Sequence, residues 1–288
     1  MRGKGFSTQL KWVSWLAAAT LFVPFVLSVP SPLTCSALRA DDDPRVTDLV
    51  KQGDADDTRG ATRDAIVKFA EADKLSPNNA SIIIRLSKEY SDLIGETKPA
   101  SEAEKMAQIS LDYARRAVDL DPKSAKAHLA LAVGYGRMTD FTDNKTKLVY
   151  SKYIKEEAEK SIAIDPTDDY AYHVLGRWNY GIASLSPVLK IMAKFIYGGL
   201  PEASMEDAAG YFKKAIEIAP QRIIHHLELA RTYTALGKTD LADKEWETIL
   251  TLHPTNGEDE AAQKEAREVL KKRDQTSATP SASPDKAH

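Results

Sequence analysis

Residues 208–220 read AAGYFKKAIEIAP, and this stretch decides the fold. Ala208, Phe212 and Ala215 are spaced by four and three residues, so they share one face of a helix. The two small residues let a second helix approach closely, and the large ring fills the space between them. Pro220 cannot continue the helix. The stretch therefore predicts a closely packed amphipathic helix that stops at a proline.

The same spacings recur four more times along the chain. The recurring sets are Ala65, Phe69, Ala72 and Pro77; Ser110, Ala114, Ala117 and Pro122; Ile154, Ala158, Ser161 and Pro166; and Ala242, Trp246, Ile249 and Pro254. A second helical pattern precedes each set. One face of it carries a Leu, a small residue or both, and in most copies also a Tyr. Its members are Gly53; Leu86 and Tyr90; Leu131, Ala132 and Tyr135; Leu175 and Gly176; and Leu229, Ala230 and Tyr233.

Two helices per unit, with small residues at the crossing and proline at the exit, resemble the tetratricopeptide repeat, whose period is about 34 residues. The last interval, from Pro220 to Pro254, has this length, and insertions around 95–102, 139–145 and 182–204 lengthen the earlier ones. We therefore predict an all-α, right-handed superhelical solenoid of about five helix pairs over residues 45–255. A charged helix over 258–273 is expected to cap its open end. Residues 274–288, rich in Ser, Pro and Ala, are expected to form a disordered tail.

The first forty residues carry four basic residues, no acidic residue, and an apolar stretch from Trp12 to Val29. This layout is typical of an export signal. The stretch is also just long enough to span a bilayer, so an N-terminal membrane anchor is the alternative. The predicted location is accordingly exported, meaning periplasmic or secreted, or membrane-anchored through residues 1–40.

Composition and motifs argue against several function classes. The 288 residues include 39 Lys and Arg against 42 Asp and Glu, so no excess positive charge points to a nucleic-acid partner. Cys35 is the only cysteine, which leaves no pair for a disulfide or a zinc cluster. The sequence has no Gly-rich phosphate loop or nucleophile elbow, and the adjacent His225 and His226 point about 100° apart on a helix. We expect no enzyme activity, no cofactor and no metal site.

The fourth unit carries a more specific resemblance. Its stretches EAEKSI (157–162), HVLGRWNY (173–180), IMAKF (191–195) and AAGYF (208–212) are similar to the regulator of microtubule dynamics family, and the likeness extends over about 81–273. The resemblance implies a helical-repeat domain behind an N-terminal membrane or targeting segment. It also implies roles in microtubule association, tethering between membranes and, in one branch, phospholipid binding and transfer. An exported protein would not meet a microtubule, so we carry over the fold and not the tubulin role.

The first helix of each unit should line the inner groove of such an array. The repeat offsets place ten residues there: Ile84, Lys88, Leu129, Val133, Tyr170, His173, Arg177, Tyr180, Leu227 and Arg231. On an acidic protein, the cations Lys88, Arg177 and Arg231 predict an anionic ligand group such as a peptide carboxylate or a lipid phosphate. The alternative is that they are ordinary ion-paired groove residues. His173 is expected to be a buried, hydrogen-bonded structural histidine.

The insertion over 186–200 is the second candidate region. Val188, Ile191, Met192, Phe195 and Ile196 share one helical face away from Lys190 and Lys194, and Gly198-Gly199 should end the helix. We expect this helix to pack on the solenoid, the alternatives being that it covers the groove or touches a membrane. The sequence thus predicts a non-enzymatic, exported or membrane-associated scaffold that binds a protein or peptide in its groove. The alternative is a phospholipid-binding or transfer module with an acyl-chain cavity under 186–200.

Overall fold

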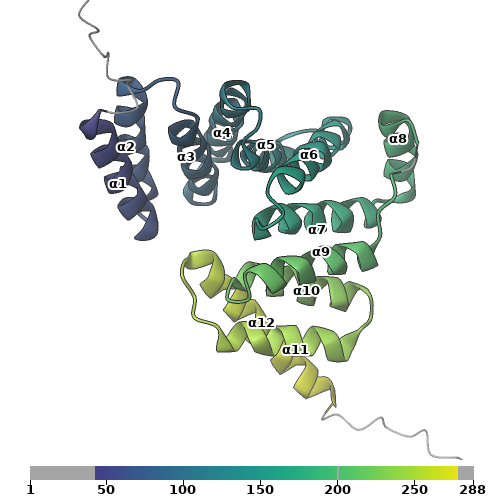
Figure 1. Cartoon of the computed structure of the whole chain (residues 1–288). Coiled ribbons are helices and arrows are strands. Elements are labelled where there is room, and N and C mark those ends of the chain that lie inside the picture. Colours follow the sequence, from purple (N-terminus) through teal and green to yellow (C-terminus); the bar gives the residue numbers. More distant parts are fainter. Residues whose placement is uncertain (1–42, 200, 278–288) are drawn as a thin grey trace, which may run out of the picture. The chain divides into compact units, whose positions relative to one another are not determined.

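The computed structural model describes residues 43–199 and 201–277, and all regular secondary structure in these ranges is helical (Figure 1). The predicted signal or anchor over 1–40 and most of the predicted tail lie outside them. The long helices are α1 (Pro44–Thr58), α2 (Thr62–Leu75), α3 (Ala80–Leu93), α4 (Ala100–Leu120), α5 (Ala125–Met138), α6 (Asn144–Ile164), α7 (Asp169–Ala183), α8 (Pro187–Tyr197), α9 (Met205–Ile218), α10 (Ile223–Ala235), α11 (Thr239–Thr251) and α12 (Gly257–Ser277). Short 3-10 turns, η2 (Ile94–Glu96) and η3 (Thr139–Phe141), follow α3 and α5.

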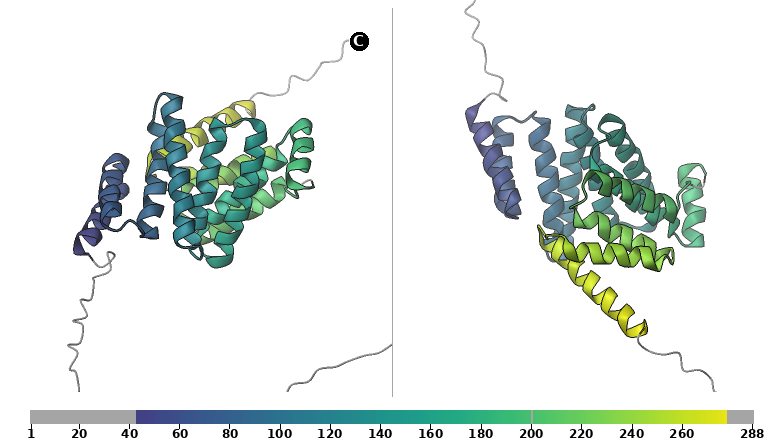
Figure 2. Two further views of the ribbon diagram at one scale, coloured as in Figure 1. Left: turned by 90° about the horizontal axis from the view of Figure 1, so that it is seen from above. Right: turned by 60° about the horizontal axis from the view of Figure 1, so that its bottom comes forward.

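Five helix pairs follow one another along the chain. They are α1 with α2, α3 with α4, α5 with α6, α7 with α9, and α10 with α11, and each pair packs on the next (Figure 2). The first helices of successive units are also in contact: α3 with α5, α5 with α7, and α7 with α10. The predicted all-α solenoid of helix pairs is confirmed. The final helix α12 packs on α10 and α11, and it extends four residues beyond the predicted end at 273.

Local sequence explains where the helices stop and start. The second helices of the first four units end two residues before Pro77, Pro122, Pro166 and Pro220. The next helix is then started by a side chain that caps free backbone N–H groups. Asn79, Ser124 and Asp168 accept such hydrogen bonds at the starts of α3, α5 and α7. The proline turn and the cap together define the first three connections between successive helix pairs, whereas α10 starts after Pro220 without a side-chain cap.

The predicted small-residue crossings form the core. Ala208, Phe212 and Ala215 on α9 are completely buried. A Cβ atom placed on Gly176 of α7 would lie 2.5 Å from Cε1 of Phe212, so the ring occupies the space that a side chain would need. Gly53 on α1 meets Phe69 of α2 at the same 2.5 Å. Glycine is therefore required at both crossings because the two helices and the ring are in contact.

The insertion forms helix α8, which packs on α6. Ala193 is buried beside Leu148 and Trp178, while Met192 and Ile196 are partly buried there. The helix packs on the solenoid as expected, but Val188, Ile191 and Phe195 of its apolar stripe are exposed. The stripe is wider than the contact with α6 can cover. Gly198 ends the helix in the left-handed conformation, with φ of 75°.

Among the described ranges, no helix combines the length and apolar character that a membrane crossing requires.

Candidate functional site

A groove of about 580 Å³ lies between α5 and α12 and is lined by residues of the first helices α5, α7 and α10. Its apolar floor includes Val133, Val174, Ile182 and Leu227. Helix α6 forms one wall, and Glu258, Ala261 and Glu265 of α12 form part of the opposite one. The groove exists because the array curves until its last helix faces the third repeat.

The structure brings six of the ten predicted groove residues together here. They are Val133, Tyr170, His173, Arg177, Leu227 and Arg231. The other four do not line the groove. Ile84 and Lys88 lie on α3, outside the part of the array that forms it, and Ile84 packs on the core of the first two repeats. Leu129 packs beside Ala132 and Val174, and Tyr180 packs against the core around Phe212.

Several groove residues were missed by the repeat offsets. Arg137 lies one helical turn after Val133, so extending the offset by four residues would have found it. Lys147 comes from a second helix of a unit, and Glu258 and Glu265 come from the cap. No repeat signal points to these three, because they reach the groove only through the curvature of the array.

The charges of the groove are segregated along its length. Arg137, Lys147 and Arg177 lie toward α5, α6 and α7, with exposed Asp140 as the one acidic neighbour in the lining there. Among the described residues, none of these three cations has a carboxylate within ion-pair distance, and Arg137 donates to Ser91 Oγ at 3.0 Å. Glu228, Glu258 and Glu265 lie toward α10 and α12. One end of the groove is therefore basic and the other acidic.

Arg231 belongs to the acidic end and is already neutralised. Its Nε and Nη2 donate to the two carboxylate oxygens of Glu265 at 3.0 and 2.5 Å, and Nη1 donates to Glu228 at 3.0 Å. The hydrogen bonds to Glu265, together with the negative charges of Glu228 and Glu265, raise the pKa of Arg231. Arg231 therefore ties α10 to α12. Arg177 is an exposed cation in the groove and has no carboxylate partner among the described residues.

A buried chain of three side chains joins α7 to α10 beneath the groove. Asp169 Oδ2 lies 2.7 Å from His225 Nε2, and His225 Nδ1 lies 3.0 Å from His173 Nδ1. Burial would raise the pKa of Asp169, yet hydrogen bonding from His225 and the charge of Arg222 hold it below its usual value. An ionised Asp169 accepts a hydrogen bond from Nε2 of His225.

His173 belongs to the same chain, and one of the two facing Nδ1 atoms donates while the other accepts. Burial, with the charges of His225 and Arg177, holds the pKa of His173 well below its ordinary value, so the ring is neutral. His173 is thus both a structural histidine and part of the groove lining.

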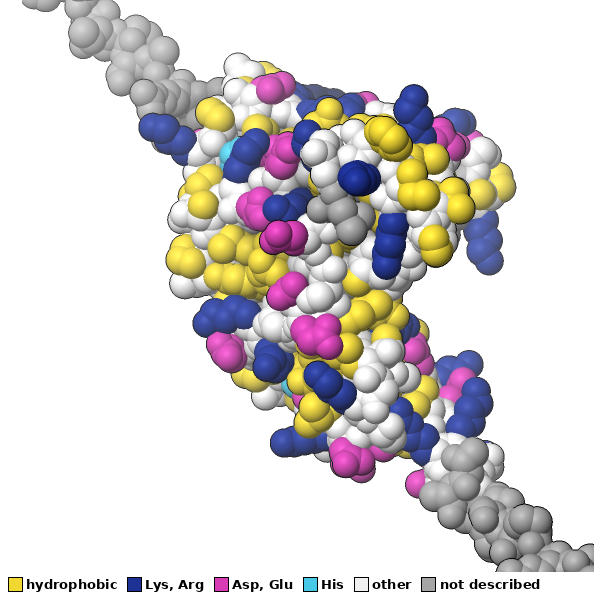
Figure 3. Space-filling view, turned by 90° about the vertical axis from the view of Figure 1, so that its right-hand side faces the viewer, with side chains coloured by type: hydrophobic (Ala, Val, Ile, Leu, Met, Phe, Trp, Pro, Cys, Tyr) yellow, Lys and Arg dark blue, Asp and Glu magenta, His cyan; other side chains and the backbone are white. Residues whose placement is uncertain are grey.

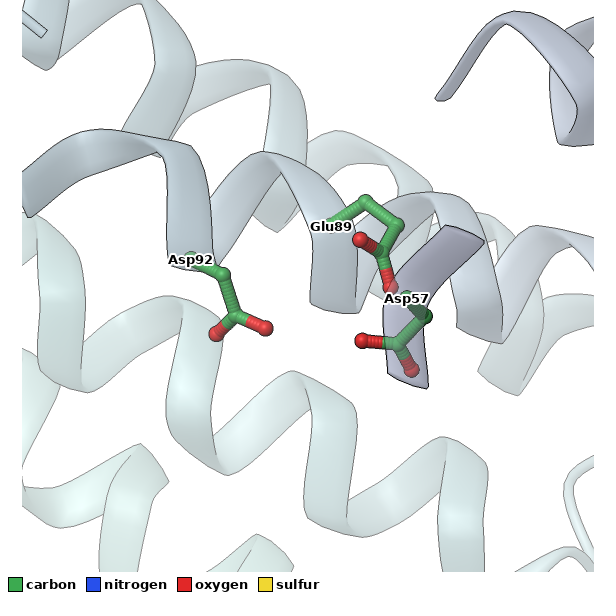
Figure 4. A group of neighbouring side chains, drawn as sticks. All are labelled: Asp57, Glu89 and Asp92. Carbon is green, nitrogen blue, oxygen red and sulfur yellow. The ribbon is translucent and has the colours of Figure 1, made fainter. Parts of the chain in front are cut away.

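A cluster of three carboxylates, Asp57, Glu89 and Asp92, lies between α1 and α3 (Figure 4). The ammonium group of Lys88 occupies its centre, 2.7 Å from Asp57 Oδ1, 2.9 Å from Asp92 Oδ2 and 3.1 Å from Glu89 Oε1. Burial raises the pKa of Glu89 to about 7. Lys88 was predicted to face a ligand, but here it takes the place that a bound cation would need and links two repeats.

Two regulator of microtubule dynamics proteins are similar to this chain in sequence. The regulator of microtubule dynamics protein 1 of Bos taurus is 30% identical over 197 residues, which is 67% of this chain and 62% of that protein. Protein 2 of the same name from Homo sapiens is 28% identical over 187 residues, covering 65% of this chain and 46% of that protein. The chain thus spans less than two thirds of the length of these relatives.

Solved structures show the same fold. A thermophilic tetratricopeptide-repeat protein of Thermus thermophilus superposes with a TM-score of 0.58 at 14% identity, over 77% of this chain and 98% of that one. The pilF protein of Pseudomonas aeruginosa superposes with a TM-score of 0.52 at 13% identity, over 81% of this chain and 87% of that one. Residues 46–274 match the family described as regulator of microtubule dynamics protein 1-3, and the chain belongs to that family.

Proposed function

We propose that this protein is a non-catalytic scaffold whose groove between α5 and α12 holds an extended segment of a protein partner. The observation that carries the proposal is the segregation of charge along the groove. A segment lying lengthwise could place an acidic group at Arg137, Lys147 and Arg177 and a basic group near Glu258. The apolar floor between them suits a side chain of Leu or Ile type.

Arg177 is the residue most directly assigned to the acidic group of the partner. It is exposed, lies on the first helix of the fourth unit, and has no carboxylate partner among the described residues. A guanidinium can bind a carboxylate through two parallel hydrogen bonds, which an ammonium cannot reproduce.

A phospholipid is the second candidate ligand. It is favoured by Leu185, in the loop after α7, and by Leu189 of α8, which extend the apolar lining of the groove. A phosphate would suit the basic end. The acidic end argues for the peptide, because Glu258 would have no counterpart on an anionic lipid.

The location of the protein is part of the proposal. We infer that the array acts outside the cytoplasm or at a membrane, and this inference is supported by the sequence pattern of residues 1–40 alone. Microscopy of the full chain carrying a C-terminal tag, with and without residues 1–40, checks it. A distribution that does not change on deletion would contradict it.

Binding of peptide pools tests the groove. Two fluorescent pools of random peptides differ only at one fixed position, which is Asp or Glu in one pool and Asn or Gln in the other. Wild-type protein should retain more of the acidic pool. Arg177→Ala should weaken that binding by about 1.5–3 kcal/mol, the scale of a hydrogen bond to a charged group. Arg177→Lys should recover only part of it.

The control variant is Arg63→Ala, which removes an exposed arginine on α2 that does not line the groove. It should leave peptide binding unchanged. Equal retention of both pools by wild type, or a large fall in melting temperature for Arg177→Ala with affinity intact, would contradict the assignment. Native mass spectrometry of the purified protein decides between the ligands, since a co-purifying phospholipid lost in Arg177→Ala would favour the lipid.

A further inference from the structure

Helix α8 carries the most exposed large apolar side chains among the described residues. Val188, Ile191 and Phe195 are 71%, 62% and 82% exposed, and the next most exposed, Val67, reaches 52%. Their spacing of three and four residues puts them on one face of the helix. The space-filling view from the side of α8 shows apolar side chains gathered on its upper part with basic ones among them (Figure 3).

The position of α8 keeps this face outward. Ala193 on the opposite face is completely buried, and Met192 and Ile196 pack against the same core as Leu148 and Trp178. The hydroxyl group of Tyr197, at the end of α8, hydrogen-bonds with Ser151 of α6 at 2.7 Å. The helix is thus held on α6 by one face, and the described chain offers nothing to cover the other.

The charges on α8 are of one sign. Lys190 and Lys194 are exposed one helical turn apart, along a flank of the apolar face. The sequence of the helix, PVLKIMAKFIY, contains no Asp or Glu. A short helix with an apolar outer face, flanked by lysines and lacking acidic residues, is complementary to a surface that is apolar below and anionic above.

We propose that α8 is a membrane-contact helix that docks on an anionic lipid surface. Val188, Ile191 and Phe195 enter the boundary between headgroups and acyl chains, and Lys190 and Lys194 pair with lipid phosphates. A bilayer fits better than a protein partner because three side chains that protrude from a single ridge need a deformable apolar phase around them. The inference rests on α8 alone and is independent of the proposed groove function.

A fluorescent label on α8 tests this in the full chain. Cys35→Ser removes the only cysteine of the sequence, and Ile191→Cys then carries an environment-sensitive dye. The protein is mixed with phosphatidylcholine vesicles that contain nitroxide-labelled lipid, with or without phosphatidylserine. The dye at position 191 should shift to the blue and be quenched when phosphatidylserine is present. Lys190→Gln and Lys194→Gln should each lower the ratio of inserted to free dye by about fivefold.

The matched control carries the dye through Leu241→Cys on α11, another exposed apolar position. Its emission should not respond to vesicles, even if residues 1–40 bring the chain to the lipid. Phe195→Ser in the Ile191→Cys background should reduce quenching while the circular dichroism spectrum stays unchanged. A water-like signal at position 191 in anionic vesicles, or equal quenching at 191 and 241, would overturn the proposal. A blue shift without vesicles that grows with protein concentration would show self-association and would overturn it too.

Discussion

At the scale of the residue, two buried histidines each contact a glutamate carboxylate and a proline carbonyl. His226 contacts Glu245 through Nδ1 at 2.7 Å and the carbonyl oxygen of Pro220 through Nε2 at 3.0 Å. His128 does the same with Glu157 at 2.5 Å and Pro122 at 2.9 Å. Both partners of the His226 ring are acceptors, so its arrangement favours the doubly protonated imidazolium. Each ring links the proline turn before its helix to the second helix of its own unit.

The stabilising effect of His226 should depend on pH. Burial opposes the charged form, but the hydrogen bonds with Glu245 and Pro220 outweigh it and raise the pKa of His226. A raised pKa in the folded state gives stability that is fully present below about pH 6.5 and is lost as pH rises through the folded-state value. His226→Ala should therefore cost about 1.5–3 kcal/mol in the acidic part of this window and clearly less above it.

Urea denaturation of wild type and His226→Ala across this range measures the difference. The pKa of Glu89 is raised to about 7, so its contribution to the stability of the protein also falls as pH rises. That fall occurs between about pH 4.5 and 7. Because that contribution is common to both proteins, it cancels in the comparison. An equal cost of His226→Ala at every pH would show that the ring is neutral in the folded protein.

At the scale of the element, the crossing of α7 and α9 leaves no room for a side chain. Gly176→Ala would bring a methyl group to 2.5 Å from the Phe212 ring, which is completely buried and cannot move aside. We expect a loss of about 1–3 kcal/mol from this overpacking. The matched control is Gly210→Ala on α9, where the added methyl group meets nothing within 4 Å. That control should be neutral or stabilising, because alanine favours the helix. Chemical denaturation of both variants is the measurement, and equal stabilities would contradict the close crossing.

At the scale of the whole molecule, the array depends on its last helix. Ala262 and Ala266 of α12 are buried in the core that contains Trp246 and Ile249, and Arg273 pairs with Asp243 of α11. Each repeat of a solenoid is stabilised only by its neighbours, so an uncovered end is unstable. Ending the chain at residue 256 should lower the free energy of unfolding by several kcal/mol, through exposure of that apolar core. Ending it at residue 277 serves as the control and should leave stability unchanged, and denaturation with a dye for exposed apolar surface checks both.

The sequence by itself determined the helix pairs, their number and their close crossings. Those features depend on local chemistry: proline ends a helix, a capping side chain starts the next, and a small residue such as Gly176 allows close approach. Val133 and Arg177 are among the predicted residues that line the groove on the first helices of the third to fifth units, whereas Leu129 and Tyr180 on the same helices do not line it. The offsets could not show which units the groove would include.

Only the tertiary structure decided which charges meet and which remain free. Arg231 is paired with Glu265 across 34 residues, and Lys88 is held by Asp57 across 31, so two of the three predicted ligand-binding cations are structural. The outward face of α8 likewise depends on how much of a wide apolar stripe α6 can cover. Helix ends are set by neighbours in sequence, whereas ion pairs and grooves are set by the curvature of the array, which sums many small rotations between repeats.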